Sequence, residues 1–115
     1  MARKMPQNLD AEMSVLGVCF LDDRVVSKVL EEVTEDMFYS DANKKIFLAI
    51  KNLHDAGVPI DQTTIADELD KTKSMGAIGG MPYLAEVMDS VVSAANLDYY
   101  INIIKKKRIV RKLIT

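Results

Sequence analysis

The sequence contains very few of the residues that cross-link small proteins. Its 115 residues include one cysteine, Cys19, and one histidine, His54. A single cysteine cannot form a disulfide within the chain, and these two side chains alone cannot supply the ligands of a structural zinc site. We therefore expect a chain that folds without disulfides or metal, in reducing surroundings such as the cytoplasm.

Long apolar runs and strand patterns are also missing. No segment approaches the ~18 consecutive apolar residues that cross a bilayer, and Arg3 and Lys4 are not followed by the apolar core of a signal peptide. No segment alternates polar and apolar residues over the length of a strand, and no Asn-Gly or Asp-Gly turn is present. Apolar residues nevertheless make up 49% of the chain. These features predict a soluble all-α protein with no membrane partner.

Capping residues and apolar spacing near 3.6 residues predict five helices before residue 93. They run from 9 to 21, from 22 or 23 to 32 or 33, from a cap at 40 to Gly57, from a cap at 61 to 70–73, and from 82 to about 92. The first is expected to bury a stripe of Leu9, Met13, Leu16 and Phe20. Residues 36–39 should form a tight turn, and the glycine-containing segment 73–81 should form a loop.

The last part of the chain is predicted to be one long helix. No glycine or proline interrupts residues 94–115, which gives a helix of about 30 Å at its 1.5 Å rise per residue. One apolar stripe holds Leu97, Ile101 and Ile104, and another holds Ile103, Val110 and Ile114, with Tyr99, Tyr100, Ile109 and Leu113 between them. A helix that is apolar on two sides must be buried twice, once on its own head and once on a partner. We therefore divide the chain into a compact multi-helix head, 1–92, and an assembly helix, 93–115.

Charge is distributed unevenly between these two parts. The head has 9 Lys and Arg against 16 Asp and Glu, whereas residues 93–115 have 6 against 1. The basic run 105–108, with Arg111 and Lys112, is the candidate for contacts with nucleic-acid phosphates. Successive helical residues point about 100° apart, so these cations cannot all face one phosphate backbone. A solvated rim beside the apolar stripes is the favoured interpretation.

No combination of residues indicates catalysis. The segment 76–80 lacks the lysine of a phosphate-binding loop and precedes a proline, which favours a turn before a helix. The acidic cluster 31–36 lies at a predicted helix end facing water, where carboxylate pairs do not acquire separated pKa values. His54 is placed at a helix C-terminus and Cys19 is expected to be a buried small hydrophobe. We predict no catalytic, cofactor-binding or metal-binding residue in this chain.

Several short motifs occur together in an order that unrelated helical proteins seldom reproduce. They are Pro6-Gln7-Asn8-Leu9-Asp10-Ala11-Glu12, Val15-Leu16-Gly17, Asp36-Met37-Phe38-Tyr39, Ile46-Phe47, Pro59-Ile60-Asp61, Gly79-Gly80 with Tyr83-Leu84, Ala94-Ala95-Asn96, Tyr100, Arg108 and Arg111. Together they resemble the N-terminal domain of DnaB-family bacterial replicative helicases over nearly the whole chain. Two positions depart from that pattern: Asp10 replaces a more common glutamate, and Val92 a common proline.

The resemblance implies a helical head followed by a helical hairpin, of which residues 93–115 would be the first helix. It also implies that a RecA-like motor domain, with the ATP and Mg sites, lies outside this chain. In that family the N-terminal domains pair through their hairpins and form a trimer of dimers on a hexameric ring that encloses DNA. They also bind DnaG-type primase and helicase loaders. The parent protein would be bacterial, or encoded by a phage or plasmid.

The resemblance and the apolar stripes together give two sets of candidate contact residues. Asp10, Tyr83 and Ile114 match positions coupled to primase in the family. The self-association candidates are Leu97, Tyr100, Ile101, Ile103, Ile104, Val110 and Ile114.

The leading hypothesis is a non-catalytic scaffold of a 5′-to-3′ replicative DNA helicase. The alternative is an independent nucleic-acid-binding module that uses the basic helix. A third interpretation, a helical adaptor unrelated to replication, requires the motif combination to be coincidence.

Overall fold

Side-chain caps set the beginnings of the first helices. In the computed structural model, which describes residues 7–114, Asn8 accepts a hydrogen bond from Ala11 N at 3.0 Å and starts α1 (Leu9–Leu21). Asp22 then caps a short 3-10 helix, η1 (Asp23–Val25), which runs directly into α2 (Val26–Glu32). The predicted helix at 22–33 is therefore present, with its first turn wound more tightly than an α-helix.

The middle of the chain follows the same pattern of caps and stops. The turn predicted at 36–39 overlaps a 3-10 helix, η2 (Glu35–Met37), and Ser40 caps α3 (Asp41–Asp55) by accepting a hydrogen bond from Asn43 N. Gly57 ends this region at a φ of 73°, a left-handed conformation that glycine adopts without steric cost. Asp61 and Thr64 form a reciprocal capping box at the start of α4 (Gln62–Lys71).

Three predicted boundaries are wrong. The helix expected from 82 to about 92 is observed as α6 (Gly80–Met88), which ends about four residues earlier. The segment 73–81 is not a continuous loop, because it contains a one-turn helix, α5 (Met75–Ile78), before α6 (Gly80–Met88). The last helix, α7 (Leu97–Ile114), begins three residues later than the predicted start at 94. Ser93 explains this delay, since its hydroxyl accepts a hydrogen bond from Ala95 N at 2.9 Å and holds the chain in a turn before the helix.

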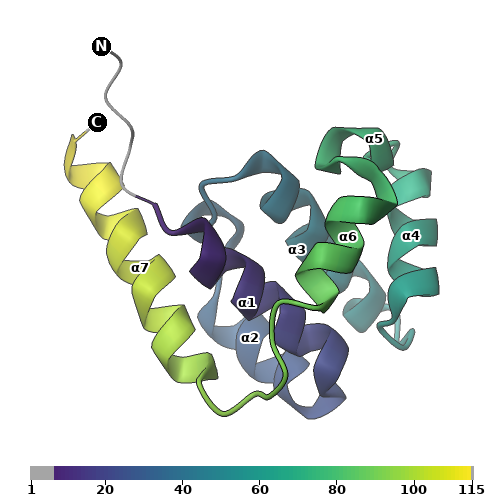
Figure 1. Cartoon of the computed structure of the whole chain (residues 1–115), viewed down its shortest axis with the longest axis horizontal. Helices are drawn as coiled ribbons and strands as arrows, with labels where there is room; N and C mark the ends of the chain where they lie inside the picture. Colours follow the sequence, from purple (N-terminus) through teal and green to yellow (C-terminus); the bar gives the residue numbers. More distant parts are fainter. Residues whose placement is uncertain (1–6, 115) are drawn as a thin grey trace.

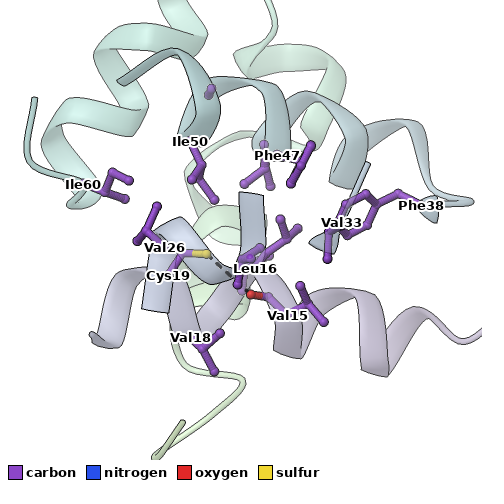
Figure 2. Close-up of a cluster of buried hydrophobic side chains, with 14 of the residues drawn as sticks. Val15, Leu16, Val18, Cys19, Val26, Val33, Phe38, Phe47, Ile50 and Ile60 are labelled. Carbon is purple, nitrogen blue, oxygen red and sulfur yellow. Dashed lines mark hydrogen bonds between the residues drawn. The ribbon is translucent and has the colours of Figure 1, made fainter. Parts of the chain in front are cut away.

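α1 is the central element of the fold. It packs against α2, α3, α6 and α7, so that α7 lies along one edge of the bundle and α4 and α5 along the opposite edge (Figure 1). Val15, Leu16, Val18 and Cys19 are completely buried, and Leu16 faces the α3 side chains (Figure 2). The predicted stripe was only partly right, because Leu16 is buried whereas Leu9 is 43% exposed. The all-α prediction is confirmed, with seven α-helices, two 3-10 helices and no strand within residues 7–114.

A close crossing of α1 and α6 depends on Gly17. A Cβ atom at this position would lie 2.6 Å from Ser90 Oγ and 2.7 Å from the Val87 carbonyl oxygen. Ser90, two residues beyond the end of α6, donates a hydrogen bond to the carbonyl of Met13, so the chain after α6 is also tied to α1. The glycine therefore lets a carbonyl and a hydroxyl approach the α1 backbone directly.

The first half of α7 is part of the hydrophobic core. Leu97, Ile101 and Ile104 are only 4%, 2% and 1% exposed, and they pack in the same cluster as the core residues of α1. These three self-association candidates are therefore buried against the head of the same chain. None of the described helices is long and apolar enough to cross a membrane.

Candidate partner-binding faces and the polar network between them

A buried carboxylate joins the first turns of α1 and α3. Glu12 is 1% exposed and accepts hydrogen bonds from Tyr39 N at 2.8 Å, Ser40 N at 3.3 Å and the Asn43 side-chain amide at 2.9 Å. These donors stand at the N-terminal end of α3, where unpaired N–H groups and the helix dipole favour a negative charge. Three donors compensate the loss of hydration that burial of a carboxylate requires.

This role of Glu12 was not predicted from the sequence. A usable signal was present, because Glu12 precedes the apolar residues Val15, Leu16 and Cys19 by three, four and seven residues. That spacing puts a charged side chain on a buried face, where it must find hydrogen-bond partners.

Tyr83 is connected to the same network. It lies in the first turns of α6, is half-buried, and its hydroxyl donates a hydrogen bond to Asn43 Oδ1. Burial raises the pKa of Tyr83 above its usual value, and the nearby charge of Glu86 acts in the same direction. Asn43 is therefore held by Tyr83 on its oxygen and by Glu12 on its nitrogen.

The three primase candidates differ in accessibility. Asp10 is exposed in the first turn of α1, two residues before Glu12. Tyr83 lies on α6, and the hydrogen bonds of Glu12 and Asn43 connect α1 to α6. Ile114 is 49% exposed at the end of α7. The side chains of Asp10 and Ile114 are therefore exposed. The ring of Tyr83 is only partly exposed, and its hydroxyl is hydrogen-bonded within the chain.

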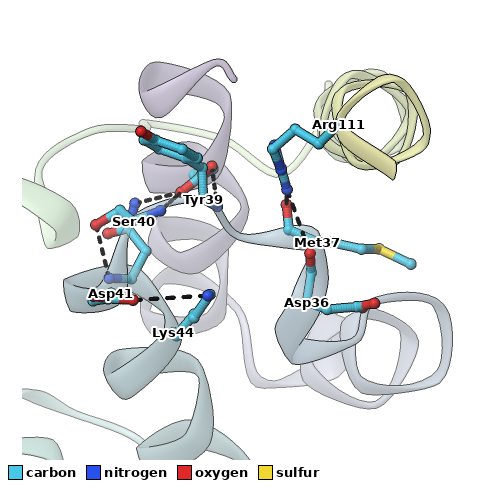
Figure 3. A network of polar contacts seen from close by, with 9 residues as sticks. Asp36, Met37, Tyr39, Ser40, Asp41, Lys44 and Arg111 are labelled. Atoms are coloured by element: carbon cyan, nitrogen blue, oxygen red, sulfur yellow. Dashed lines mark hydrogen bonds and ion pairs between the residues drawn. The ribbon is translucent and has the colours of Figure 1, made fainter. Parts of the chain in front are cut away.

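A second polar cluster attaches the end of α7 to the head. Arg108 Nε lies 2.8 Å and Lys112 Nζ 3.3 Å from the carboxylate of Asp36. Arg111 donates hydrogen bonds to the carbonyl oxygens of Asp36 and Met37 at 3.3 and 3.0 Å (Figure 3). Its guanidinium carbon also lies 5.7 Å from the centre of the Tyr39 ring, which is within cation–π range.

The electrostatics of this cluster centre on Asp36. The pKa of its carboxyl is lowered to about 2, first by the hydrogen bond from Thr34 and then by Arg108 and Lys112. Two further ion pairs join α7 to α2: Lys28 Nζ lies 2.9 Å from Asp98 Oδ1, and Lys105 Nζ lies 3.9 Å from Glu32 Oε1. Ion pairs between the acidic head and the basic α7 therefore hold α7 against the head of the same chain.

This arrangement removes most of the support for the nucleic-acid alternative. Four of the six cations of α7 contact acidic or carbonyl oxygens of the head; they are Lys105, Arg108, Arg111 and Lys112. Within residues 7–114, Lys106 and Lys107 are the cations of this run for which no such contact is found. Two cations are too few for the salt-dependent affinity of a dedicated nucleic-acid site.

The side of α7 that faces away from the head is largely apolar. Its exposed apolar residues are Tyr99 at 68%, Ile109 at 54%, Val110 at 42%, Leu113 at 80% and Ile114 at 49%. Residues spaced three or four apart lie on the same face of a helix. One such series in α7 consists of Tyr99, the partly buried Ile103, Lys106, Val110 and Leu113. We call these five positions, 99, 103, 106, 110 and 113, the outer face of α7. It is the main exposed apolar feature of the described chain.

An open hollow and the reactive residue types cysteine and histidine occur among residues 7–114. A hollow of about 330 Å³ is lined by Thr34, Glu35, Asp36 and Lys44 and is open to solvent. Burial raises the pKa of Cys19 to about 12, which keeps its thiol protonated and unreactive. His54 Nε2 lies 3.4 Å from Ser27 Oγ on the surface. Among residues 7–114 no group of three or more His, Cys, Asp or Glu side chains is arranged to hold a metal ion.

The structure is therefore an all-α head whose last helix is held by core and charged contacts and displays one largely apolar face. The sequence matches the DnaB-like helicase N terminal domain over residues 4–106. The chain belongs to this family.

Relatives at the sequence level are complete replicative helicases. The chain is 39% identical over 112 residues to "Replicative DNA helicase DnaC" of Bacillus subtilis, covering 97% of this chain and 25% of that protein. It is also 39% identical over 109 residues to "Replicative DNA helicase DnaB" of Geobacillus stearothermophilus, covering 95% of this chain and 24% of the relative. The chain thus spans about a quarter of the length of these relatives. It contains their N-terminal domain, and the motor domain is absent from these 115 residues.

Solved structures agree with this assignment. The N-terminal domain of DnaB helicase from Mycobacterium tuberculosis superposes with a TM-score of 0.91 at 39% identity, covering 96% of this chain and 80% of that chain. A DnaB-like replicative helicase described with its interactions with primase gives a TM-score of 0.79 at 24% identity, covering 93% of this chain and 25% of that chain. At that identity the second likeness establishes the fold alone.

Proposed function

We propose that this domain is a non-catalytic scaffold that brings copies of a bacterial replicative DNA helicase together in a hexameric ring, as a trimer of dimers around DNA. The outer face of α7 is the observation that supports this role. Its inner side is already buried on the head through Leu97, Ile101 and Ile104, so its outer side remains for another helix. The occupants we propose are the second helix of the hairpin and the hairpin of a second copy.

The residues proposed for self-association follow from this division. Tyr100 and Ile103 are partly buried, and Val110 and Ile114 are exposed, so these four remain candidates. Tyr99 and Leu113 join them because of their exposure on the same side of the helix. A stable interface has a well-packed apolar centre with a polar rim, which this helix can provide with its flanking lysines.

We also propose that the head binds a DnaG-type primase and a helicase loader. Support comes from two structures with the same fold, which are described with their interactions with primase. Asp10, Tyr83 and Ile114 are the proposed contact or regulatory positions. ATP and Mg would be bound by the motor domain alone, and we expect a cytoplasmic location for the assembly.

Sedimentation equilibrium with two matched variants tests the assembly role. Leu113→Asp places a charge on the outer face of α7, whereas Val92→Asp places the same charge at a residue that is 94% exposed outside the helices. We expect the unmodified chain to form dimers as its concentration rises toward millimolar. Leu113→Asp should weaken dimerisation by at least about tenfold, the effect of burying an unpaired charge, and Val92→Asp should leave it unchanged. A chain that stays monomeric at millimolar concentration would contradict the proposed pairing.

A further inference from the structure

The segment 36–40 is contacted by two helices that lie on different sides of it. α7 contacts its first part, because Arg111 donates hydrogen bonds to the carbonyl oxygens of Asp36 and Met37 (Figure 3). α1 contacts its second part, because Glu12 accepts hydrogen bonds from the backbone of Tyr39 and Ser40. The Tyr39 side chain returns toward α7 and lies beside the Arg111 guanidinium.

The same carboxylate reaches the candidate primase residue on α6. Glu12 Oε1 accepts a hydrogen bond from Asn43 Nδ2 at 2.9 Å, and Asn43 Oδ1 accepts one from the Tyr83 hydroxyl. A continuous series of contacts therefore runs from Tyr83 through Asn43 and Glu12 to Tyr39, and from Tyr39 to Arg111. It connects α6, α3, α1 and α7, which hold residues from four separate parts of the sequence.

We propose that Glu12 is a positioning residue that couples Tyr83 on the head to the end of α7. The inference rests on the proposed function, in which Tyr83 is a partner contact and α7 is the assembly helix. Through this coupling, a partner that moves the Tyr83 hydroxyl alters how firmly Arg111 holds α7. The orientation of the outer face of α7 then depends on whether the Tyr83 site is occupied.

Burial is the physical reason that the contacts act together. Asn43 is 0% exposed and Glu12 is 1% exposed, so water cannot replace a hydrogen bond that either of them loses. If Asn43 follows a displaced Tyr83 hydroxyl, Glu12 loses one of its three donors while its charge remains buried. The carboxylate must then shift on its two remaining donors, which belong to the backbone of the segment that Arg111 contacts. Networks of this kind in a low dielectric respond cooperatively.

A double-mutant cycle measures this coupling directly. Tyr83→Phe removes only the hydroxyl, and Arg111→Met removes the guanidinium while keeping an unbranched apolar stem. Substitutions at sites that share no partner have nearly additive effects on the unfolding equilibrium. We expect the combined effect of this pair to depart from additivity by about threefold or more in the unfolding equilibrium constant, as coupled sites do. Tyr99→Phe with Arg111→Met is the matched control, because Tyr99 lies on the outer face of α7 and should give an additive result.

The Glu12→Gln background assigns the coupling to the carboxylate. There the non-additivity between Tyr83→Phe and Arg111→Met should disappear, since an amide cannot accept from all three donors. If it persists, Glu12 is not the connecting residue and the inference fails. Additivity in the unmodified background would overturn it as well.

A second measurement decides the matter even if Glu12→Gln does not fold. In nitrogen-15 NMR spectra, Tyr83→Phe should shift the backbone amides of Tyr39 and Ser40 and the side-chain Nε–Hε signal of Arg111. Tyr99→Phe should leave these signals in place. Shifts that stop at Asn43 would contradict the coupling.

Neither measurement requires primase, so the two ideas fail separately. The double-mutant cycle can show coupling while Tyr83→Phe still binds primase with unchanged affinity. That result supports the inference and shows that the Tyr83 hydroxyl is not a primase contact. Absence of coupling rejects the inference whatever the primase affinity.

Discussion

The two halves of α7 are attached to the head by different forces. Residues 97–104 contribute three aliphatic side chains to the core, whereas residues 105–112 contact the head through charged groups at its surface. The same side of the helix makes both attachments, because Arg108 and Arg111 continue the four- and three-residue steps of Leu97, Ile101 and Ile104. The first half is therefore a fixed part of the fold, and the second half is held by contacts that salt and pH can weaken.

Removing a core side chain from the first half should have the largest effect. Ile101→Ala leaves a cavity between α7 and the head and should lower the free energy of unfolding by about 2–5 kcal/mol. Val110→Ala on the outer face is the matched control and should change it by less than about 0.5 kcal/mol in the monomer. Urea denaturation at low protein concentration measures both. Equal losses of unfolding free energy for Ile101→Ala and Val110→Ala would contradict the burial of Ile101 in the core and the exposure of Val110.

Removing the anion that holds the second half should have a smaller effect that depends on salt. Asp36→Asn deletes the ion pairs with Arg108 and Lys112, and because Asp36 is about half exposed the expected loss is at most about 1 kcal/mol. That loss should shrink when the salt concentration rises to about 1 M, where the Debye length is about 3 Å. The loss caused by Ile101→Ala should not shrink. A salt-independent effect of Asp36→Asn would contradict ionic attachment.

The same carboxylate predicts how the second half responds to acid. Because the pKa of Asp36 is about 2 in the folded chain and lies below its usual value of 3.8, the ionised group stabilises the fold above pH 4. This contribution should be lost as the pH falls from about 4 toward 2. Amide hydrogen exchange along α7 should show residues 108–114 opening in this window before residues 100–104. In Asp36→Asn the pH-dependent step in this region should be missing.

Nucleic-acid binding through the second half should be the weakest effect. With four of the six cations engaged on the head, we expect a salt slope of no more than about 2 for duplex DNA, corresponding to Lys106 and Lys107. Lys106→Ala together with Lys107→Ala should remove this residual binding, and fluorescence anisotropy with labelled DNA measures it. A slope near 6 would show that α7 releases its head contacts to bind DNA, which would restore the nucleic-acid alternative.

Local chemistry made much of the helical framework predictable. Asn8, Ser40 and Asp61 cap helices as expected, because a cap depends on a side chain and an N–H group only a few residues away. Gly57 stops its helix for an equally local reason. The start of α7 was misplaced because Ser93 uses its hydroxyl in a turn, an option that helix propensity alone does not reveal.

The polar network could not be predicted in the same way. Glu12 meets donors that lie 27 to 31 residues further along the chain, and Arg111 meets carbonyls 74 and 75 residues before it. Such pairings depend on how whole helices pack. The two-sided character of α7 was visible in the sequence, but the choice of Leu97, Ile101 and Ile104 for the inner side required the fold.

Intermolecular contacts at the outer face of α7 provide the most direct test of the scaffold role. In a mixture of isotope-labelled and unlabelled chains at millimolar concentration, filtered NOE spectra report only contacts between different copies. We predict cross-peaks from the methyl groups of Val110 and Leu113 to the other copy, and none from Ile101. Spectra without intermolecular cross-peaks, or with cross-peaks confined to residues outside α7 such as Val92, would contradict the role of α7 as the assembly helix.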